Sequence, residues 1–241
     1  MILKEFGLDL PYQTEKDKIE EIMYEKNLSH EEATRYDYEA NWKQKRRVFS
    51  LETRCITSMF ERLFSKFNTV DCRKIIVECV DKVDDERILN FSGVYTVQVK
   101  FSFDKFIVCN DRDKKNRALN LLMEGIEKIN IEKKWENTTF EDVYNKIIRL
   151  DYKNEWMWGK TLKSPKKDKI AVVLCQHEVK EMSIFIVLKD MQGIELERKK
   201  IITELPDEFA YAKHLGKIKW VSDNEVRLYN KKGTQSWSYL R

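Results

Sequence analysis

Two stretches decide the fold of this chain: Lys169-Ile-Ala-Val-Val-Leu-Cys-Gln-His177 and Met182-Ser-Ile-Phe-Ile-Val-Leu-Lys-Asp190. Each contains an apolar run that is too short for a typical helix and rich in β-branched residues. Such runs are typical of central strands covered on both faces. The neighbouring segments continue the pattern, with turn residues between most of them. We expect seven strands, near residues 156–162, 169–177, 182–190, 193–202, 216–221, 225–230 and 235–240, which together predict an antiparallel β-meander.

The amino-terminal part alternates between helical and strand patterns. A capping box, Ser29-His-Glu-Glu32, opens one helix, and apolar residues at helical spacing from Ile56 to Phe67 predict another. Three strands are expected in an antiparallel sheet, at 75–79, 94–101 and 103–109. In the later meander, Glu195–Ile201 is expected to be an edge strand. Two more helices should follow, the first capped by Asp111 or Asp113 and the second by Thr138-Thr139.

These patterns predict an α+β protein. Residues 1–153 form a helical portion with a three-stranded antiparallel sheet, and residues 154–241 form the β-meander. One continuous domain is the alternative, because 241 residues can bury either one large core or two smaller ones.

The composition indicates a globular protein with a densely charged surface. Hydrophobic residues make up 42% of the chain and charged residues 36%, a charged fraction above that of an average soluble domain. Lysine and arginine total 45 against 41 aspartates and glutamates, and the two signs are interleaved along the chain. The net charge of +4 therefore gives no general support for nucleic-acid binding.

The sequence favours a cytoplasmic location. Charged residues occur among the first residues, so no export signal is expected. The purely apolar runs, such as Ile170–Cys175, are far shorter than the roughly 20 residues of a membrane helix. Five widely spaced cysteines form no Cys-x-x-Cys pair, which predicts reduced thiols and no structural zinc site.

One pattern could indicate an enzyme. Gln98-Val-Lys100, preceded by Asp84 and Asp85, resembles the metal-binding triplet of restriction-like nucleases, in which carboxylates hold a divalent cation and a lysine helps to activate water. Gln98 carries no charge, however, and an alternating strand often produces such a triplet by chance. Three scattered histidines and only seven glycines supply neither a nucleophile–base pair nor a phosphate-binding loop. We expect no cofactor or metal and favour a protein without catalytic activity.

Aromatic residues beside cations are the better indication of a binding surface. Trp156 and Trp158 precede Lys160 and Lys163, and Trp42 precedes Arg46 and Arg47. Tryptophan and arginine dominate the energetics of protein interfaces, so these seven residues are the candidate partner-binding residues. Nucleic acid is the alternative partner, because cations hold phosphates and indoles stack on bases. Solvated helix faces and lysine-protected sheet edges would give the same pattern without any partner.

The turn chemistry of the carboxyl-terminal part adds a resemblance. The segments Lys163-Ser-Pro-Lys-Lys-Asp168, Asp190-Met-Gln-Gly193 and Lys219-Trp-Val-Ser-Asp-Asn224 resemble the β-meander of some bacterial polymorphic-toxin immunity proteins, and also a β-propeller blade. The immunity family implies a cytoplasmic, non-enzymatic protein that binds one toxin domain and blocks its site. A slightly basic chain would suit a toxin with an acidic surface. A nucleic-acid-binding protein or a metal-dependent nuclease remains the alternative.

Overall fold

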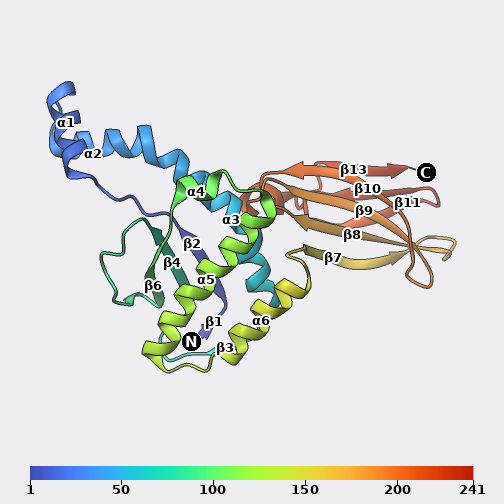
Figure 1. Cartoon of the computed structure of the whole chain (residues 1–241). Helices are drawn as coiled ribbons and strands as arrows, with labels where there is room; N and C mark the ends of the chain where they lie inside the picture. Colours follow the sequence, from blue (N-terminus) through green and yellow to red (C-terminus); the bar gives the residue numbers. More distant parts are fainter. Residues whose placement is uncertain (241) are drawn as a thin grey trace. The chain divides into compact units, whose positions relative to one another are not determined.

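The computed structural model describes residues 1–240, and the chain divides into two compact units, Met1–Tyr152 and Lys153–Arg241 (Figure 1). Unit 1 combines helices with a sheet, and unit 2 consists mainly of antiparallel strands. The predicted α+β class is confirmed. Within the described residues, no helix has both the length and the apolar character needed to cross a membrane.

Unit 1 contains short and long elements of both kinds. Its strands are β1 (Ile2–Leu3), β2 (Glu5–Asp9), β3 (Phe67–Asn68), β4 (Lys74–Val80), β5 (Leu89–Phe91) and β6 (Val94–Lys100). Its helices are α1 (Lys16–Lys26), α2 (His30–Asp37), the π-helix η1 (Tyr38–Trp42), α3 (Lys43–Leu63), α4 (Phe103–Ile107), α5 (Asp111–Lys133) and α6 (Thr138–Arg149).

The main sheet of unit 1 has the strand order β2-β4-β6-β5. Strands β2, β4 and β6 run parallel, and only β5 is antiparallel to its neighbour β6. The expected antiparallel pairing of residues 75–79 with 94–101 is therefore wrong. After β4 the chain reaches the outer edge, forms the β5–β6 hairpin and returns beside β4 in the same direction. Periodicity along single strands carries no information about this path.

Helices cover one face of this sheet, as Figure 1 shows for α5. The buried side chains of β4 and β6 alternate as predicted, with Ile75, Val77 and Cys79 on the covered face. α5 packs so closely that a Cβ atom on Gly125 would lie 2.9 Å from Cγ1 of Val77 and closer still to its Cγ2. The opposite face is open at β2, where a Cβ atom on Gly7 would meet nothing within 4 Å.

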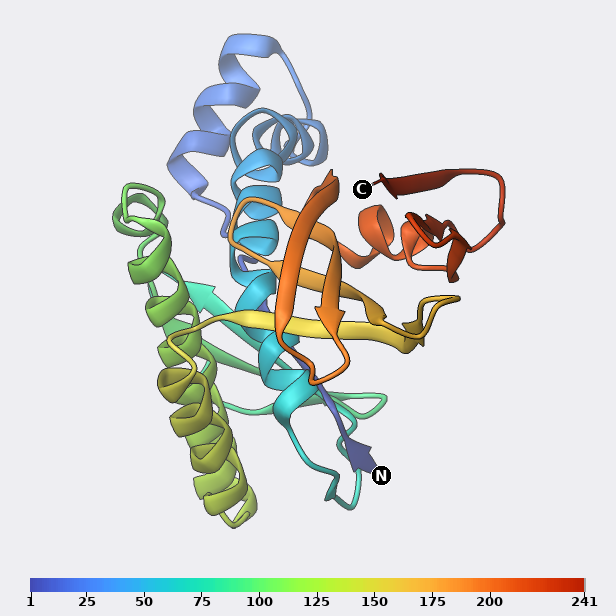
Figure 2. The ribbon, with the colours of Figure 1, turned by 90° about the vertical axis from the view of Figure 1, so that its right-hand side faces the viewer.

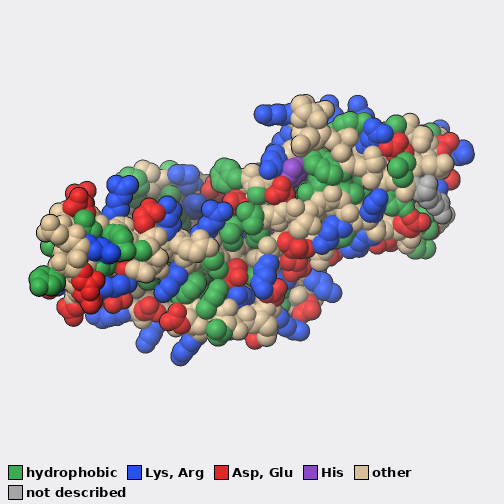
Figure 3. Space-filling model, turned by 90° about the horizontal axis from the view of Figure 1, so that it is seen from above, with side chains coloured by type: hydrophobic (Ala, Val, Ile, Leu, Met, Phe, Trp, Pro, Cys, Tyr) green, Lys and Arg blue, Asp and Glu red, His purple; other side chains and the backbone are tan. Residues whose placement is uncertain are grey.

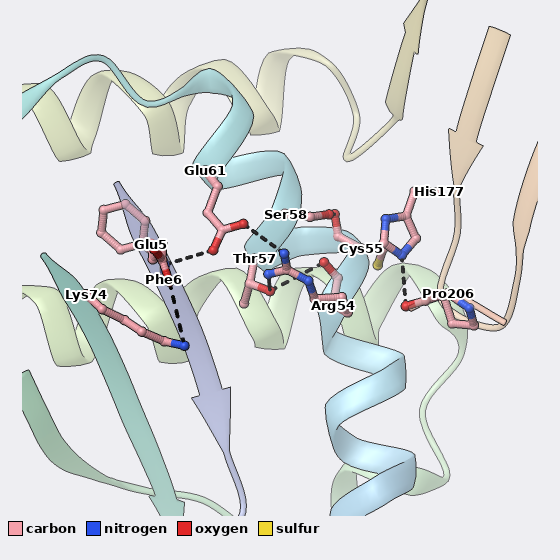
Figure 4. A network of polar contacts seen from close by, with 10 residues as sticks. All are labelled: Glu5, Phe6, Arg54, Cys55, Thr57, Ser58, Glu61, Lys74, His177 and Pro206. Atoms are coloured by element: carbon pink, nitrogen blue, oxygen red, sulfur yellow. Dashed lines mark hydrogen bonds and ion pairs between the residues drawn. The ribbon is translucent and has the colours of Figure 1, made fainter. Parts of the chain in front are cut away.

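A charged side chain fixes α3 against the free edge of β2 (Figure 4). The backbone N–H of Phe6 donates to Oε1 of Glu61 at 3.0 Å, and Nη2 of Arg54 donates to Oε2 of the same carboxylate at 2.9 Å. An N–H at the edge of a sheet has no neighbouring strand as a partner, so Glu61 provides the acceptor that a further strand would supply. Strand β2 was not predicted from the sequence.

Three further expectations for unit 1 are wrong. Residues 103–109 do not form a strand, because Phe103–Ile107 is the short helix α4. Its Phe106 packs against the rings of Phe49 and Phe101, and this burial favours the helix over the apparent alternation. The N-cap of α5 is Asn110, whose side chain accepts from the N–H of Asp113, so neither Asp111 nor Asp113 is the cap. The N-cap of α6 is Asn137, so Thr138 and Thr139 are the first residues of that helix and not its cap.

Unit 2 consists of seven antiparallel strands in two sheets (Figure 2). The strands are β7 (Asn154–Lys163), β8 (Lys169–His177), β9 (Met182–Asp190), β10 (Glu195–Glu204), β11 (Ile218–Ser222), β12 (Glu225–Tyr229) and β13 (Ser236–Leu240). The first four form a sheet of order β10-β9-β8-β7, and the last three form a second sheet. Between the sheets lie α7 (Glu208–Tyr211) and the 3-10 helix η2 (Ala212–His214).

The two apolar stretches are the central strands of unit 2, as predicted. β8 and β9 are buried along most of their length. On one face, residues such as Ile184 and Ile186 pack with Val226, Leu228 and Tyr239 of the second sheet. The alternate residues Val172, Leu174, Phe185 and Val187 form a second buried cluster. β10 is an edge strand with an exposed first half, again as predicted.

Candidate functional site

The edge strand β7 carries four of the candidate residues. It pairs with β8 on one side only, and the pairing register breaks between Trp158 and Leu162. Gly159, at φ +73°, begins this bulge. Nε1–H of Trp220 donates to the carbonyl oxygen of Leu162 at 3.2 Å and holds the far side of the bulge in place. The irregularity therefore has a fixed position in the strand.

Large side chains on this strand differ in exposure. Trp156 is partly buried and packs against the core of unit 2, so it has a structural role. Trp158 is 37% exposed, and Met157, which lies on the opposite face of this edge strand, is 54% exposed. Lys160 and Lys163 are exposed on the same strand and form no ion pair within residues 1–240. We call Met157, Trp158, Lys160 and Lys163 the β7 surface.

The charge near the β7 surface is predominantly positive. Lys166 reaches Asp223 at 3.4 Å and Lys169 reaches Asp168 at 3.9 Å, which leaves the two lysines of the β7 surface uncompensated. Elsewhere, basic and acidic side chains are interspersed over the face that Figure 3 shows. Exposed edge strands commonly carry lysines and bulges that prevent sheet extension. That protective role explains Gly159 and Lys160 but not the exposure of Trp158 and Met157.

The second candidate cluster serves the structure of unit 1. Nε1–H of Trp42 donates to the carbonyl oxygen of Leu10 at 3.1 Å. The guanidinium of Arg46 donates to both carboxylate oxygens of Asp9, at 2.8 and 2.7 Å, and these hydrogen bonds raise the pKa of Arg46. Arg47 alone is exposed. Trp42 and Arg46 are therefore anchors at the end of the π-helix and do not form a free surface.

A buried carboxylate near this cluster was not predicted. Asp37, at the end of α2, accepts hydrogen bonds from the side chains of Tyr12 and Asn41, each at 2.7 Å. It also forms an ion pair with Lys18 at 2.7 Å. Burial acts to raise the pKa of Asp37, but these donors outweigh burial and hold that pKa below its ordinary value. Two of its partners, Tyr12 and Lys18, come from distant positions in the sequence, so the local pattern around Asp37 and Asn41 does not mark this residue.

The residues of the nuclease pattern are held in structural contacts. The side-chain oxygen of Gln98 accepts from the backbone N–H groups of Asp84 and Asp85, at 3.1 and 3.2 Å, and its amide nitrogen donates to Glu78 at 3.3 Å. The Asp85 carboxylate binds Arg87, whose hydrogen bonds lower the pKa of Asp85 to about 2. Gln98 therefore positions the loop that carries Asp84 and Asp85.

Lys100, the fourth residue of that pattern, lies at the end of β6 and lines a pocket of about 740 Å³. The other lining residues come from the end of β4, from the segment around α4 and from the first turns of α5: Asp81, Phe101, Ser102, Lys105, Phe106, Cys109, Asp113, Asn116 and Arg117. This pocket was not predicted from the sequence. Ligand pockets commonly form where the carboxyl ends of adjacent parallel strands lie side by side. The sheet expected from the sequence was antiparallel, so it placed no such ends together. No three His, Cys, Asp or Glu side chains in the described chain are grouped to hold a metal ion.

Two of the three histidines make buried or partly buried hydrogen bonds, and the third is exposed. Nε2 of the buried His177 lies 3.2 Å from the carbonyl oxygen of Pro206, which can only accept, so Nε2 carries the proton (Figure 4). Nε2 of His214 lies 2.7 Å from Glu204, and this hydrogen bond lowers the pKa of Glu204. His30 is exposed at the start of α2.

Comparisons with protein families, with curated proteins and with solved structures give no significant match. Any function must therefore be argued from the surfaces and the pocket themselves.

Proposed function

We propose that this protein is a cytoplasmic, non-enzymatic protein that binds another protein through the β7 surface, in the manner of a bacterial toxin-immunity protein. The observation that carries the proposal is the exposure of Trp158 and Met157 on an edge strand with two unpaired lysines. An indole and a thioether that remain accessible to water gain free energy when a partner covers them. Burying a side chain of this size is worth roughly 1.5–3 kcal/mol.

The charge of the β7 surface supports a partner of a particular kind. Lys160 and Lys163 favour a protein with an acidic patch, because opposite charges speed encounter and disfavour wrong partners. The immunity-type resemblance contributes a toxin domain as the class of partner, and the acidic surface is inferred from the charge of this chain alone. The nuclease alternative has weaker support, since the side chain of Gln98 and the carboxylate of Asp85 already have structural partners.

Affinity capture tests the proposal. Tagged full-length protein would be used to capture partners from nuclease-treated lysate of the cells that make it. The wild type is compared with the double variant Trp158→Ala/Lys160→Glu. The matched control is Tyr24→Ala/Lys66→Glu, which also removes an exposed aromatic residue and reverses one exposed lysine. We expect one protein to be captured by the wild type and the control and lost with the β7 variant.

Co-expression separates an immunity role from other protein binding. The captured protein, expressed alone, should stop cell growth, and the wild type should restore growth while the β7 variant should not. Capture that occurs from untreated lysate but is lost from nuclease-treated lysate would instead indicate nucleic acid as the partner. Equal capture by both variants would contradict the β7 surface as the binding site.

A further inference from the structure

We propose that the pocket at the ends of β4 and β6 binds a small organic molecule with one negatively charged group and an apolar ring. This proposal goes beyond the protein-binding function and does not depend on it. We call this cavity the strand-end pocket.

The position of the pocket favours ligand binding. Asp81 directly follows β4, while Lys100 ends β6, so two adjacent parallel strands deliver their carboxyl ends to its rim. In sheets of parallel strands, ligands bind at these ends, where the connecting segments diverge and leave a crevice. The volume of about 740 Å³ lies within the range of small-molecule sites, roughly 300–1,000 Å³.

The floor of the pocket is rigid and apolar. Phe101 and Phe106 line the pocket, and their ring centroids are 5.6 Å apart. Phe49, which is fully buried, packs against both rings, at 5.0 and 5.4 Å. A preformed aromatic floor favours a planar or aliphatic ring, because little side-chain freedom is lost when the ligand binds.

The cations of the pocket select the charge of the ligand. Arg117 is fixed by Glu124 at 3.2 Å and by the carbonyl oxygen of Lys100 at 3.2 Å. Lys100 and Lys105 form no ion pair within residues 1–240, so their ammonium groups are free to meet an anion. An ammonium beside an apolar floor suits a ligand that joins one acidic group to a ring.

The carboxylates of the pocket limit that charge. Asp81 and Asp113 are also part of the lining, and Asp113 accepts from the side-chain amide of Asn110 at 2.8 Å. Both carboxylates would repel a polyphosphate, whereas a single negative group can lie beside the lysines. The pocket is therefore better suited to a monoanion than to a nucleoside triphosphate.

Cys109 supplies a reporter for occupancy. It lines the pocket and is the only one of the five cysteines that is not buried. Its Sγ lies 3.1 Å from the backbone carbonyl oxygen of Lys105, so the thiol is held against a segment that also lines the pocket. A ligand in the pocket should therefore shield Cys109 from an alkylating reagent.

A pair of dyes tests the proposal on the full chain. 1-Anilinonaphthalene-8-sulfonate has apolar rings and one negative group, and N-phenyl-1-naphthylamine has the same rings without the charge. We expect the sulfonate to bind at one site per chain and to slow iodoacetamide alkylation of Cys109 severalfold. The neutral dye should bind about tenfold more weakly, a difference of about 1.4 kcal/mol. ATP should not displace the sulfonate.

Charge reversal locates the site. Lys100→Glu and Lys105→Glu should each weaken sulfonate binding about tenfold or more, which corresponds to about 1.4 kcal/mol or more. Lys66→Glu, an equal change of charge just before β3, should leave the affinity unchanged. All three lysines are exposed, so circular dichroism should show an intact fold.

Three results would overturn the proposal. These are sulfonate binding without saturation, unchanged Cys109 reactivity at dye saturation, and equal affinities of the Lys66→Glu and Lys100→Glu variants. Displacement of the sulfonate by ATP would contradict the preference for a monoanion.

Discussion

Nζ of Lys114 lies 2.7 Å from the carboxylate of Glu52, and this ion pair links α5 to α3 inside unit 1. The two side chains are only 4% and 13% exposed, so each charge depends on the other. Removing water from two ions is costly, and their attraction offsets this cost only while both are present.

The first prediction concerns this pair. Lys114→Met should lower the free energy of unfolding by roughly 3–5 kcal/mol, because it leaves the Glu52 carboxylate buried and unpaired. The exposed pair Lys43–Glu39, whose charged atoms lie 2.6 Å apart, is the control, and Lys43→Met should cost at most about 1 kcal/mol. Urea denaturation at neutral pH measures both. A Lys114→Met protein as stable as the wild type would contradict the buried ion pair.

The second prediction tests the contact between α5 and the sheet. Gly125→Ala should destabilise the protein by roughly 1–3 kcal/mol through overpacking against Val77, whose buried, branched side chain cannot move aside. Alanine favours a helix over glycine by only about 1 kcal/mol, so the clash should dominate. Gly7→Ala is the matched control, because its added Cβ meets nothing within 4 Å. In thermal denaturation, Gly7→Ala should leave stability unchanged or raise it slightly. Equal losses of stability from Gly125→Ala and Gly7→Ala would refute the packing described.

These packing features show which parts of the fold were open to prediction. The two apolar runs of β8 and β9 identify central strands because a strand exposed on either face would carry polar residues there. The alternation in β4 and β6 likewise identifies the buried face. Pairing direction depends on how the chain travels between strands, which explains why β4 and β6 were wrongly expected to be antiparallel.

The functional surfaces were predictable to a lesser degree. An edge position for Trp158 follows from the polar residues around it, and the structure agrees in leaving it partly exposed. Trp42 and Arg46 look equally suitable in sequence, but their partners Leu10 and Asp9 lie more than thirty residues away. The strand-end pocket depends on the parallel arrangement and on α4, both of which were predicted incorrectly.

The third prediction concerns pH. The pKa of Asp37 is below its ordinary value in the folded protein, so the ionised carboxylate contributes stability above the unfolded pKa of about 4. That contribution is lost as the pH falls from about 4 through the folded pKa. Asp37→Asn should therefore be less stable than the wild type at pH 7, and the difference should shrink below pH 4. Urea denaturation of both proteins across this range measures it, and a difference independent of pH would contradict the prediction.

The fourth prediction concerns thiol reactivity. Burial raises the pKa of Cys72 to about 11 and that of Cys175 to about 12, so neither should form the reactive thiolate at neutral pH. Cys109 alone is accessible. Native protein treated with Ellman's reagent should react rapidly at one thiol per chain, and Cys109→Ser should abolish this reaction. Rapid reaction of two or more thiols in the native protein would show that the buried cysteines are accessible.

The central claim is that the β7 surface binds an acidic protein partner, and the affinity of that partner tests it most directly. Isothermal titration of the captured protein should give a dissociation constant at least about tenfold higher for Trp158→Ala/Lys160→Glu than for the wild type. This ratio corresponds to a loss of about 1.4 kcal/mol of binding free energy. The Tyr24→Ala/Lys66→Glu control should bind like the wild type. Identical affinities for the wild type and the β7 variant would contradict the account.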